Sequence, residues 1–186
     1  KYRHMDAIYS PFEGTYVFQK QRFQDKRGSL IELYRKEEML PFLDSNIFVQ
    51  DLFTVSNSGV LRGLHFQVNH PQGKLISVLH GKIFDVFVDI RMNSSTFGKW
   101  HSIELSDENA LQIYLPAGFA HGFLTQSDSA SVNYKLTNYY DPNDQNTLMW
   151  DDKTISIDWP KIKNMSISEK DSQGISFQEL KEIINK

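Results

Sequence analysis

The sequence predicts an all-β sandwich or barrel with a few short helices. Apolar and polar residues alternate along much of the chain, which is the period of a half-buried strand. The strand-like segments are short and recur at intervals of roughly 8–12 residues, a spacing typical of all-β sandwiches and barrels. The 186 residues contain no internal repeat, low-complexity tract or linker. One domain is therefore the simplest organisation.

Two of these segments lie close together in the middle of the chain. Residues 75–79 and 83–90 are rich in β-branched and aromatic residues, and each predicts a strand. Because His80-Gly81-Lys82 between them has the composition of a turn, we expect the two strands to pair as a hairpin. Further strands are predicted at residues 100–105, 111–115, 122–125 and 131–136.

Helical signals are few. Residues 36–40 predict one short helix that ends at Pro41, whose ring cannot continue a helix. Residues 176–184 have helical spacing, and Ser176 with Glu179 has the pattern of a capping box. We expect both helices to lie at the periphery.

Composition excludes several classes of function. The chain has no cysteine, which excludes disulfides, thiolate metal sites and cysteine nucleophiles and fits a cytoplasmic protein. A net charge of −3 gives no reason to expect a nucleic-acid partner. No run of about 18 apolar residues exists, so we expect no membrane span. No signal peptide is visible at the start, where residues 1–5 are a candidate cloning remnant and Met5 a candidate native start.

The first constellation that could carry chemistry surrounds Gly63. Arg62 and His65 lie three residues apart, and in a regular strand their side chains would face opposite sides. They would share a pocket only if the backbone kinks or bulges there, which Gly63 permits. A lone histidine is more often a structural residue, but it is also the side chain best matched to a general base near neutral pH.

The second constellation is residues 116–123, where a Pro-x-Gly turn delivers His121 to the start of a strand. This segment resembles the second motif of the cupin barrels, many of which bind a metal through this histidine and three ligands of their first motif. In the matching first region His65 is followed by Phe66-Gln67, and no glutamate stands at ligand spacing. We therefore expect no metal. His121 is either a hydrogen-bonded barrel residue or a substrate contact.

Two later segments are ambiguous when read alone. Tyr134, Tyr139 and Tyr140 fall within seven residues, and such tyrosines are usually barrel wall. A phenol is nevertheless a plausible proton donor opposite a histidine, and an aromatic face can stack on a nucleobase. Residues 168–171 look like a solvated charge run.

Taken together, these segments resemble the dTDP-4-dehydrorhamnose 3,5-epimerase family, whose members are cupin-type barrels. The resemblance runs from about residue 8 to residue 175, and it rests on the order and spacing of many motifs. They are residues 25–28 with Glu32, 49–51, 59–67, 72–75, 84–91, 116–123, 134–135, 139–140, 150–152, 158–160 and 168–171. The resemblance implies an all-β, cupin-type double-stranded β-helix (jelly-roll) barrel with a few short peripheral helices.

The resemblance also implies roles for matching residues. His65 is expected to be the general base, Asp171 the carboxylate that orients it, and Tyr134 the general acid on the opposite face of the sugar. Lys74 is expected near the C4 oxygen. The expected substrate-binding residues are Arg62, Arg27 and Lys170 at the diphosphate or sugar, Tyr140 stacked on the base, and Glu32, Gln50 and His121 in the pocket wall.

The implied reaction needs no cofactor. A C4 ketone acidifies the protons on C3 and C5, so a base and an acid on opposite faces suffice to invert each centre through an enolate. We expect inversion at both carbons, from dTDP-4-dehydro-6-deoxyglucose to dTDP-4-dehydrorhamnose. Family members are usually homodimers that exchange N-terminal strands, so some nucleotide contacts are expected from the partner.

Other functions stay open at this point. One is an epimerase that inverts only C3 or only C5 of a related nucleotide sugar. The others are a non-catalytic sugar-nucleotide-binding cupin and a metal-dependent cupin enzyme. Leu52 and Gln145 depart from the family pattern, which commonly has asparagine and glutamate at these positions.

Overall fold

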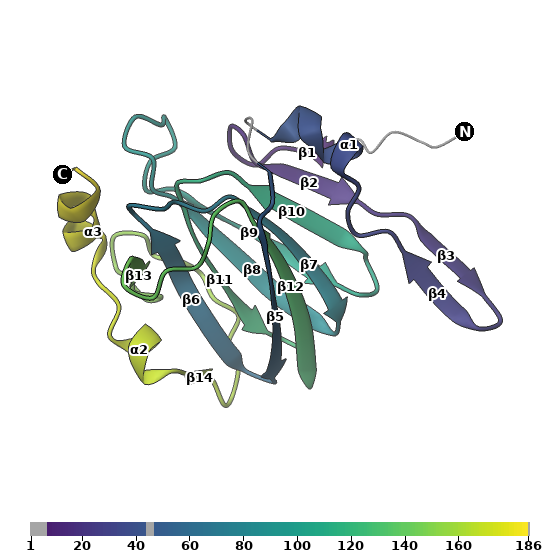
Figure 1. Cartoon of the computed structure of the whole chain (residues 1–186). Coiled ribbons are helices and arrows are strands. Elements are labelled where there is room, and N and C mark those ends of the chain that lie inside the picture. The colour runs from purple at the N-terminus through teal and green to yellow at the C-terminus, as the bar shows by residue number, and fades with distance from the viewer. Residues whose placement is uncertain (1–6, 44–46, 186) are drawn as a thin grey trace.

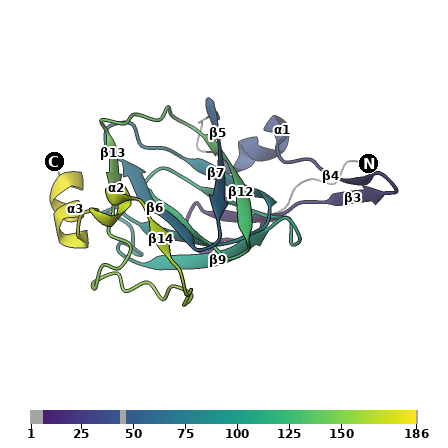
Figure 2. The ribbon, with the colours of Figure 1, turned by 90° about the horizontal axis from the view of Figure 1, so that it is seen from below.

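The computed structural model describes residues 7–43 and 47–185. Two antiparallel β-sheets face each other and enclose a barrel-like interior, as Figure 1 and the perpendicular view in Figure 2 show. The expectation about residues 1–5 lies outside the described residues. The all-β, cupin-type barrel with short peripheral helices is confirmed.

The first sheet has the strand order β1-β2-β10-β7-β12-β5. Strand β5 is an edge strand, and β12 pairs with it along its whole length. The bounds are β1 Ala7–Tyr9, β2 Tyr16–Gln19, β5 Gln50–Asn57, β7 Lys74–His80, β10 Leu111–Leu115 and β12 Ser129–Leu136.

The second sheet has the strand order β13-β6-β11-β8-β9, with β14 pairing parallel to β6. The bounds are β6 Val60–Gln67, β8 Lys82–Asp89, β9 Trp100–Ser106, β11 Phe119–Thr125, β13 Gln145–Thr147 and β14 Ser166–Ile167. Strand β6 therefore gathers partners from three later parts of the chain.

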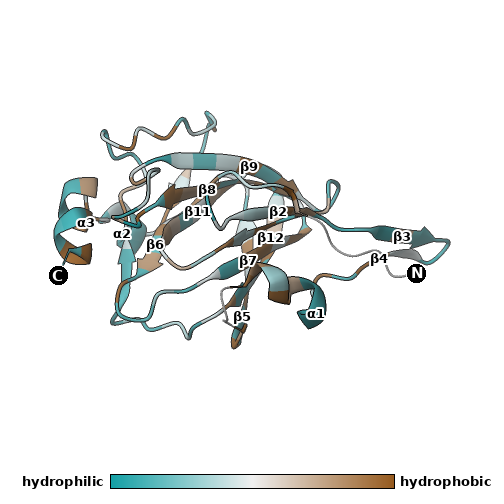
Figure 3. Ribbon diagram, turned by 90° about the horizontal axis from the view of Figure 1, so that it is seen from above, coloured by the Kyte–Doolittle hydropathy of each residue, from teal (hydrophilic) through white to brown (hydrophobic). Residues whose placement is uncertain are grey.

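Strand β8 shows why this sequence forms a barrel wall. Ile83 and Phe87 point into the apolar interior between the sheets. Val86 and Val88 point outward, where the C-terminal segment covers them. Because both faces are buried, the strand reads as an almost continuous apolar run, and Figure 3 colours β8 and its neighbour β11 largely brown.

Short helices cover the outer faces. On the first sheet, Met39 from α1 (Lys36–Met39) packs on Phe18 and Tyr114. On the second, Phe177 and Leu180 of α3 (Phe177–Ile184) complete an outer apolar layer, and α2 (Glu169–Ser172) precedes them. The predicted C-terminal helix and its capping box are confirmed. Helix α1 ends at Met39, and Pro41 lies in a following 3-10 helix, Leu40–Phe42.

The predicted hairpin of residues 75–79 and 83–90 is wrong. Both segments are strands, but β7 lies in the first sheet and β8 in the second, so they do not pair. The chain crosses between the sheets at Gly81, whose φ is +76°. A side chain here would collide with the backbone oxygen of Ser129. A turn-forming tripeptide cannot reveal whether its flanking strands share a sheet.

A separate hairpin projects from the barrel on the side opposite α3 (Figures 1 and 2). It consists of β3 (Arg22–Asp25) and β4 (Gly28–Ile31), which pair with each other and with no other strand of the described residues. Among helices within residues 7–43 and 47–185, none has the length and apolar character to cross a bilayer.

Gly81→Ala is expected to lower the free energy of unfolding by about 2–4 kcal/mol. The alanine would have to adopt a left-handed backbone conformation, and its Cβ would collide with the backbone oxygen of Ser129. The matched control is Gly28→Ala, which also has a positive φ, +126°, but has nothing within 4 Å of the added carbon. That variant is expected to lose only about 1 kcal/mol. Urea unfolding of both variants measures the difference, and equal losses would show that the crossing at Gly81 is not tightly packed.

Candidate active site

A pocket opens between the two sheets, and both sheets supply its walls. Strands β5, β7 and β12 contribute from one side and β6 and β11 from the other, while loops form the rim. The lining residues are Leu52, Thr54, Arg62, His65, Gln72, Lys74, His121, Gly122, Phe123, Tyr134, Leu136, Tyr140 and Gln145.

Arg62 and His65 line the same pocket because β6 is irregular at Gly63. His65 pairs with His121 of β11 but Arg62 pairs with Phe123, so three steps along β6 match two along β11. This extra residue rotates the strand and brings both side chains to one face. Gly63 has a φ of +102°, and a Cβ there would lie 2.6 Å from the His121 backbone oxygen. The kink that the sequence permitted is confirmed.

Asp171 holds the His65 ring. Nε2 of His65 lies 2.6 Å from Oδ1 of Asp171. The other carboxylate oxygen accepts a hydrogen bond of 3.1 Å from the backbone N–H of Gly63. Asp171 is buried in α2 and its backbone N–H donates to the capping Ser168 side chain, so the helix fixes its position. These contacts join β6 to α2, two segments that lie about 100 residues apart in the sequence.

The electrostatics of this pair favour a neutral imidazole beside a carboxylate. Burial lowers the pKa of His65, and the hydrogen bond to Asp171 only partly opposes it. For Asp171, burial raises the pKa, but hydrogen bonds from His65, Gly63 and Ser168 outweigh it, so its pKa lies below the usual value. An uncharged imidazole held in one orientation is the form that can accept a proton.

Lys74 supplies a buried cation on the opposite sheet. Its ammonium donates a 3.1 Å hydrogen bond to the backbone oxygen of His65. Burial lowers its pKa to about 8, although the negative charge of Asp85 raises it. A cation this far removed from water can stabilise a negative oxygen strongly.

Tyr134 and His121 meet across the interior. Their ring centroids are 5.9 Å apart with an interplanar angle of 73°. Burial and then the charge of Asp85 raise the pKa of Tyr134, so the phenol keeps its proton at neutral pH. Nε2 of His121 lies 2.7 Å from Oδ2 of Asp85. His121 is therefore a hydrogen-bonded barrel residue that also lines the pocket, and its contact with a substrate stays a prediction.

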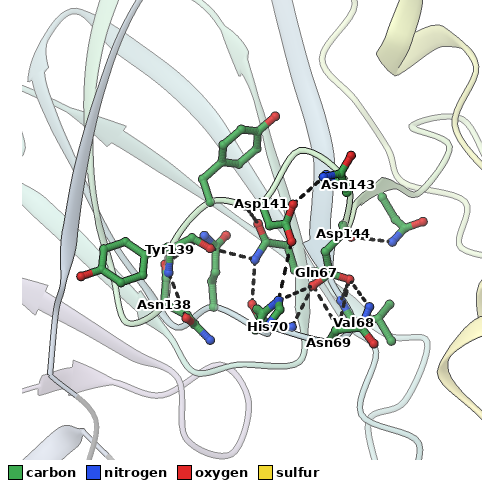
Figure 4. Close-up of polar contacts among 12 residues, drawn as sticks. Gln67, Val68, Asn69, His70, Asn138, Tyr139, Asp141, Asn143 and Asp144 are labelled. Carbon is green, nitrogen blue, oxygen red and sulfur yellow. Dashed lines mark hydrogen bonds and ion pairs between the residues drawn. The ribbon is translucent and has the colours of Figure 1, made fainter.

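A polar cluster holds the rim on which Tyr140 lies. Asp144 accepts hydrogen bonds from the backbone N–H groups of Val68, Asn69 and His70, at 2.8–3.1 Å. Gln67 donates to the backbone oxygens of His70 and Tyr139, and these contacts are drawn in Figure 4. The loop after β6 and the loop after β12 are thereby fixed to each other.

Four predicted binding residues do not line this pocket. Gln50 lies at its rim, where its side chain accepts a 2.7 Å hydrogen bond from the backbone N–H of Tyr140. Lys170 lines a neighbouring hollow next to α2. Arg27 is at the tip of the β3–β4 hairpin, paired with Asp25, and Glu32 follows that hairpin, paired with Arg35. Their substrate contacts stay predictions.

Sequence reasoning missed Asp85 and Asp144. The alternation of side chains along β8 could have identified Asp85. It falls between Ile83 and Phe87 on the inward-facing side of an otherwise apolar strand. Asp144 lies in a polar loop and gives no such signal. Within the described ranges, no three His, Asp or Glu side chains are grouped to hold a metal ion, and the expectation of a metal-free site stays a prediction.

Comparisons with known proteins identify the family. The sequence profile of the dTDP-4-dehydrorhamnose 3,5-epimerase family matches residues 10–179. The epimerase of that name from Methanothermobacter thermautotrophicus is 44% identical over 88% of this chain and 90% of its own length. The one from Escherichia coli K12 is 42% identical over 95% of this chain and 96% of its own.

Solved structures of epimerases have the same fold as this chain. The Legionella pneumophila dTDP-6-deoxy-D-glucose-3,5-epimerase, in complex with dTDP-4-keto-L-rhamnose, superposes with a TM-score of 0.90 at 40% identity, covering 95% of this chain and 97% of that one. A 3'-monoepimerase from Streptomyces bikiniensis, in complex with dTDP-quinovose, has a TM-score of 0.86 at 27% identity, covering 93% and 88%.

Fold and pocket define this protein as a cupin-type isomerase of the class that epimerises carbohydrates. Within that class, the chain belongs to the dTDP-4-dehydrorhamnose 3,5-epimerase family.

The buried Lys74 predicts a pH-dependent stability. Between pH 8 and pH 10.5 the unfolded chain holds a proton on Lys74 that the folded chain has released, so the free energy of unfolding rises with pH. Lys74→Met removes this rise. Across that pH range the free energy of unfolding of the natural chain is expected to increase by about 3 kcal/mol more than that of the variant.

Urea unfolding at pH 7.5 and pH 10.5 measures the difference. The control is Lys82→Met at a lysine whose side chain is 45% exposed, and this variant is expected to show no such change. A constant difference between the natural chain and Lys74→Met would mean that Lys74 titrates like a solvated lysine.

Proposed function

We propose that this chain inverts C3 and C5 of dTDP-4-dehydro-6-deoxyglucose to give dTDP-4-dehydrorhamnose, by proton transfer through an enolate. The observation that carries the proposal is the position of His65 and Tyr134. They line one pocket from the two facing sheets, His65 on β6 and Tyr134 on β12. A base and an acid on opposite faces of a sugar ring are what inversion requires.

Each group has an environment suited to its role. His65, neutral and oriented by Asp171, removes the proton next to the C4 ketone. With the Nε2–H donated to Asp171, the lone pair is on Nδ1. Lys74 is the cation for the enolate oxygen, and the protonated phenol of Tyr134 donates to the other face. An oxyanion donor of this kind is worth about 3–4 kcal/mol in the barrier.

The nucleotide is assigned from the relatives. Structural neighbours bound to dTDP-4-keto-L-rhamnose and to dTDP-quinovose support a dTDP-linked substrate. Tyr140, 41% exposed at the rim, offers a face for the thymine, and Arg62 offers a cation to the diphosphate or sugar. Leu52 and Gln145 line the same pocket. They are the residues through which this chain would differ from others in substrate fit.

A homodimer that exchanges N-terminal segments would complete the site. The outer face of edge strand β5 carries Phe53 and Val55, which are 58% and 59% exposed. Phe23 and Leu30 face each other on the β3–β4 hairpin and are 52% and 64% exposed. A projecting apolar hairpin and an uncovered edge strand fit a second copy. Arg27 and Glu32 would then reach the partner's pocket.

His65→Ala is expected to abolish deuterium uptake at C3 and C5 of the dTDP-4-keto sugar in D2O, a loss of about 100-fold or more for a general base. Tyr134→Phe is expected to keep part of the proton abstraction but to impair inversion at C5. NMR of the product reports both carbons. His101→Ala, at a histidine outside the pocket on β9, serves as the control. Normal exchange in His65→Ala would show that the base is another group.

Mixing two inactive variants tests the exchanged dimer. If Arg27 of one chain serves the pocket of the other, a hybrid of Arg27→Ala and His65→Ala chains contains one site with both residues intact. Refolding the variants together is then expected to restore up to about a quarter of the natural activity, since random pairing makes half the dimers hybrid and each has one of two sites intact. If the mixture is no more active than the two variants measured separately and added, Arg27 serves the pocket of its own chain.

A further inference from the structure

Two glutamine side chains hold the backbone around Tyr140. Its N–H donates to Oε1 of Gln50 at 2.7 Å. On either side of it, the backbone oxygen of Tyr139 accepts from Nε2 of Gln67 at 3.1 Å, and the backbone N–H of Asp141 donates to Oε1 of Gln67 at 2.9 Å. Figure 4 draws the two contacts of Gln67. The three consecutive residues 139–141 are therefore each fixed by a side-chain amide.

The two glutamines come from opposite walls of the pocket. Gln50 begins β5 of the first sheet, and Gln67 ends β6 of the second. Because the pocket lies between these sheets, residues 139–141 are joined to both of its walls. A ligand that contacts Tyr140 therefore meets a surface whose place is set relative to both sheets.

Gln67 makes the larger number of these contacts. It is 5% exposed, and its amide nitrogen also donates to the backbone oxygen of His70 at 2.7 Å. Both hydrogens of the amide nitrogen and the amide oxygen are thus engaged. A buried polar network that is fully satisfied specifies one arrangement of the groups it joins. Gln67 therefore fixes the loop after β12 against the loop after β6.

The ring of Tyr140 depends on these backbone contacts for its position. Tyr140 is 41% exposed, so packing surrounds only part of the side chain. An aromatic face open at the rim of a pocket is available to stack on a nucleobase. If its loop were free to move, binding would have to order the loop, and this ordering would weaken the affinity. Here the hydrogen bonds order the loop in advance.

Gln67 also connects the rim to the proposed base. It lies two residues after His65 in β6, so the two side chains are on the same side of the strand. Strand β13 pairs without a shift along this part of β6, beyond the irregularity at Gly63. One regular stretch of strand thus sets the place of the reacting imidazole and of the loop that carries Tyr140.

We propose that Gln67 is a positioning residue for nucleotide recognition, which holds residues 139–141 so that the ring of Tyr140 is in place for the base of dTDP before the substrate arrives. Gln67 is not among the residues that line the pocket, and it acts through Tyr140. The inference rests on the part of the proposed function that assigns a dTDP-linked substrate to this pocket and its thymine to Tyr140.

Binding of dTDP alone, measured by titration calorimetry, separates recognition from chemistry. Gln67→Met keeps the length of the side chain but removes the amide, and the Kd for dTDP is expected to rise about 10-fold. With dTDP-4-dehydro-6-deoxyglucose, KM is expected to rise by a similar factor while kcat stays within about twofold, the pattern of lost uniform binding. Gln67→Asn keeps a polar group in the buried site but is too short for all the contacts. It is the second variant if Gln67→Met folds poorly, and the same changes are expected.

A double-mutant cycle shows whether Gln67 acts through Tyr140. Tyr140→Ala removes the aromatic face and is expected to weaken dTDP binding by about 10-fold or more. Adding Gln67→Met to Tyr140→Ala is expected to change the Kd by no more than about twofold, because no ring is left to position.

Asn109→Leu is the matched structural control. The side-chain amide of Asn109 also bonds backbone groups of three residues, in the turn between β9 and β10 and away from the pocket. The three are Glu104, Ser106 and Leu111. This variant is expected to lower the free energy of unfolding without changing the Kd for dTDP or KM.

Failure of this inference differs from failure of the proposed reaction. If the natural chain binds dTDP but labels neither carbon in D2O, the reaction is wrongly assigned while the role of Gln67 in binding stands. The inference is overturned if the natural chain does not bind dTDP, or if the Gln67 variants bind it as the natural chain does. It is also overturned if the two losses multiply in the double variant, or if kcat falls while KM is unchanged.

Discussion

Lys74, Asp85 and Asp171 hold their charges where less than a tenth of each residue is exposed. Taking such groups out of water costs several kcal/mol each, and only close, well-oriented partners offset it. The partners here come from both sheets and from α2, so the charges can be accommodated only in the closed barrel. The same desolvation keeps His65 neutral and Tyr134 protonated, and links the stability of the fold to its chemistry.

The local sequence pattern predicts most strands of the barrel, but it does not predict which strands pair. Alternation located β8, β10 and β12, and the capping residues located α3. The mistaken hairpin at Gly81 shows the limit, because sheet membership depends on segments that are distant in the sequence. Asp171 illustrates the same point for the site. Its own neighbourhood looks like a solvated charge run, and only the path of the C-terminal segment across β6 puts it against His65.

The pocket combines side chains held on paired strands with a rim made partly of loops. His65, Lys74, His121 and Tyr134 project from paired strands, whose geometry tolerates little movement. Tyr140 and Gln72 lie on loops, yet these loops are joined by the contacts of Gln67 and Asp144. Leu52 and Gln145 line the same pocket, so its shape can change at these positions while the four strand-borne side chains keep their places.

The order in which the strands pair has a consequence for synthesis of the chain. In the two large sheets, β6 needs β11, β13 and β14, and β5 and β7 both need β12. A ribosome releases these partners late, so most of the N-terminal half emerges with apolar strands and open edges. Chains arrested before about residue 136 would lack the wall that closes the barrel. Long-range pairing of this kind folds slowly and leaves unpaired strand edges exposed until the last partners arrive, so the closing of the barrel depends on the C-terminal half of the chain.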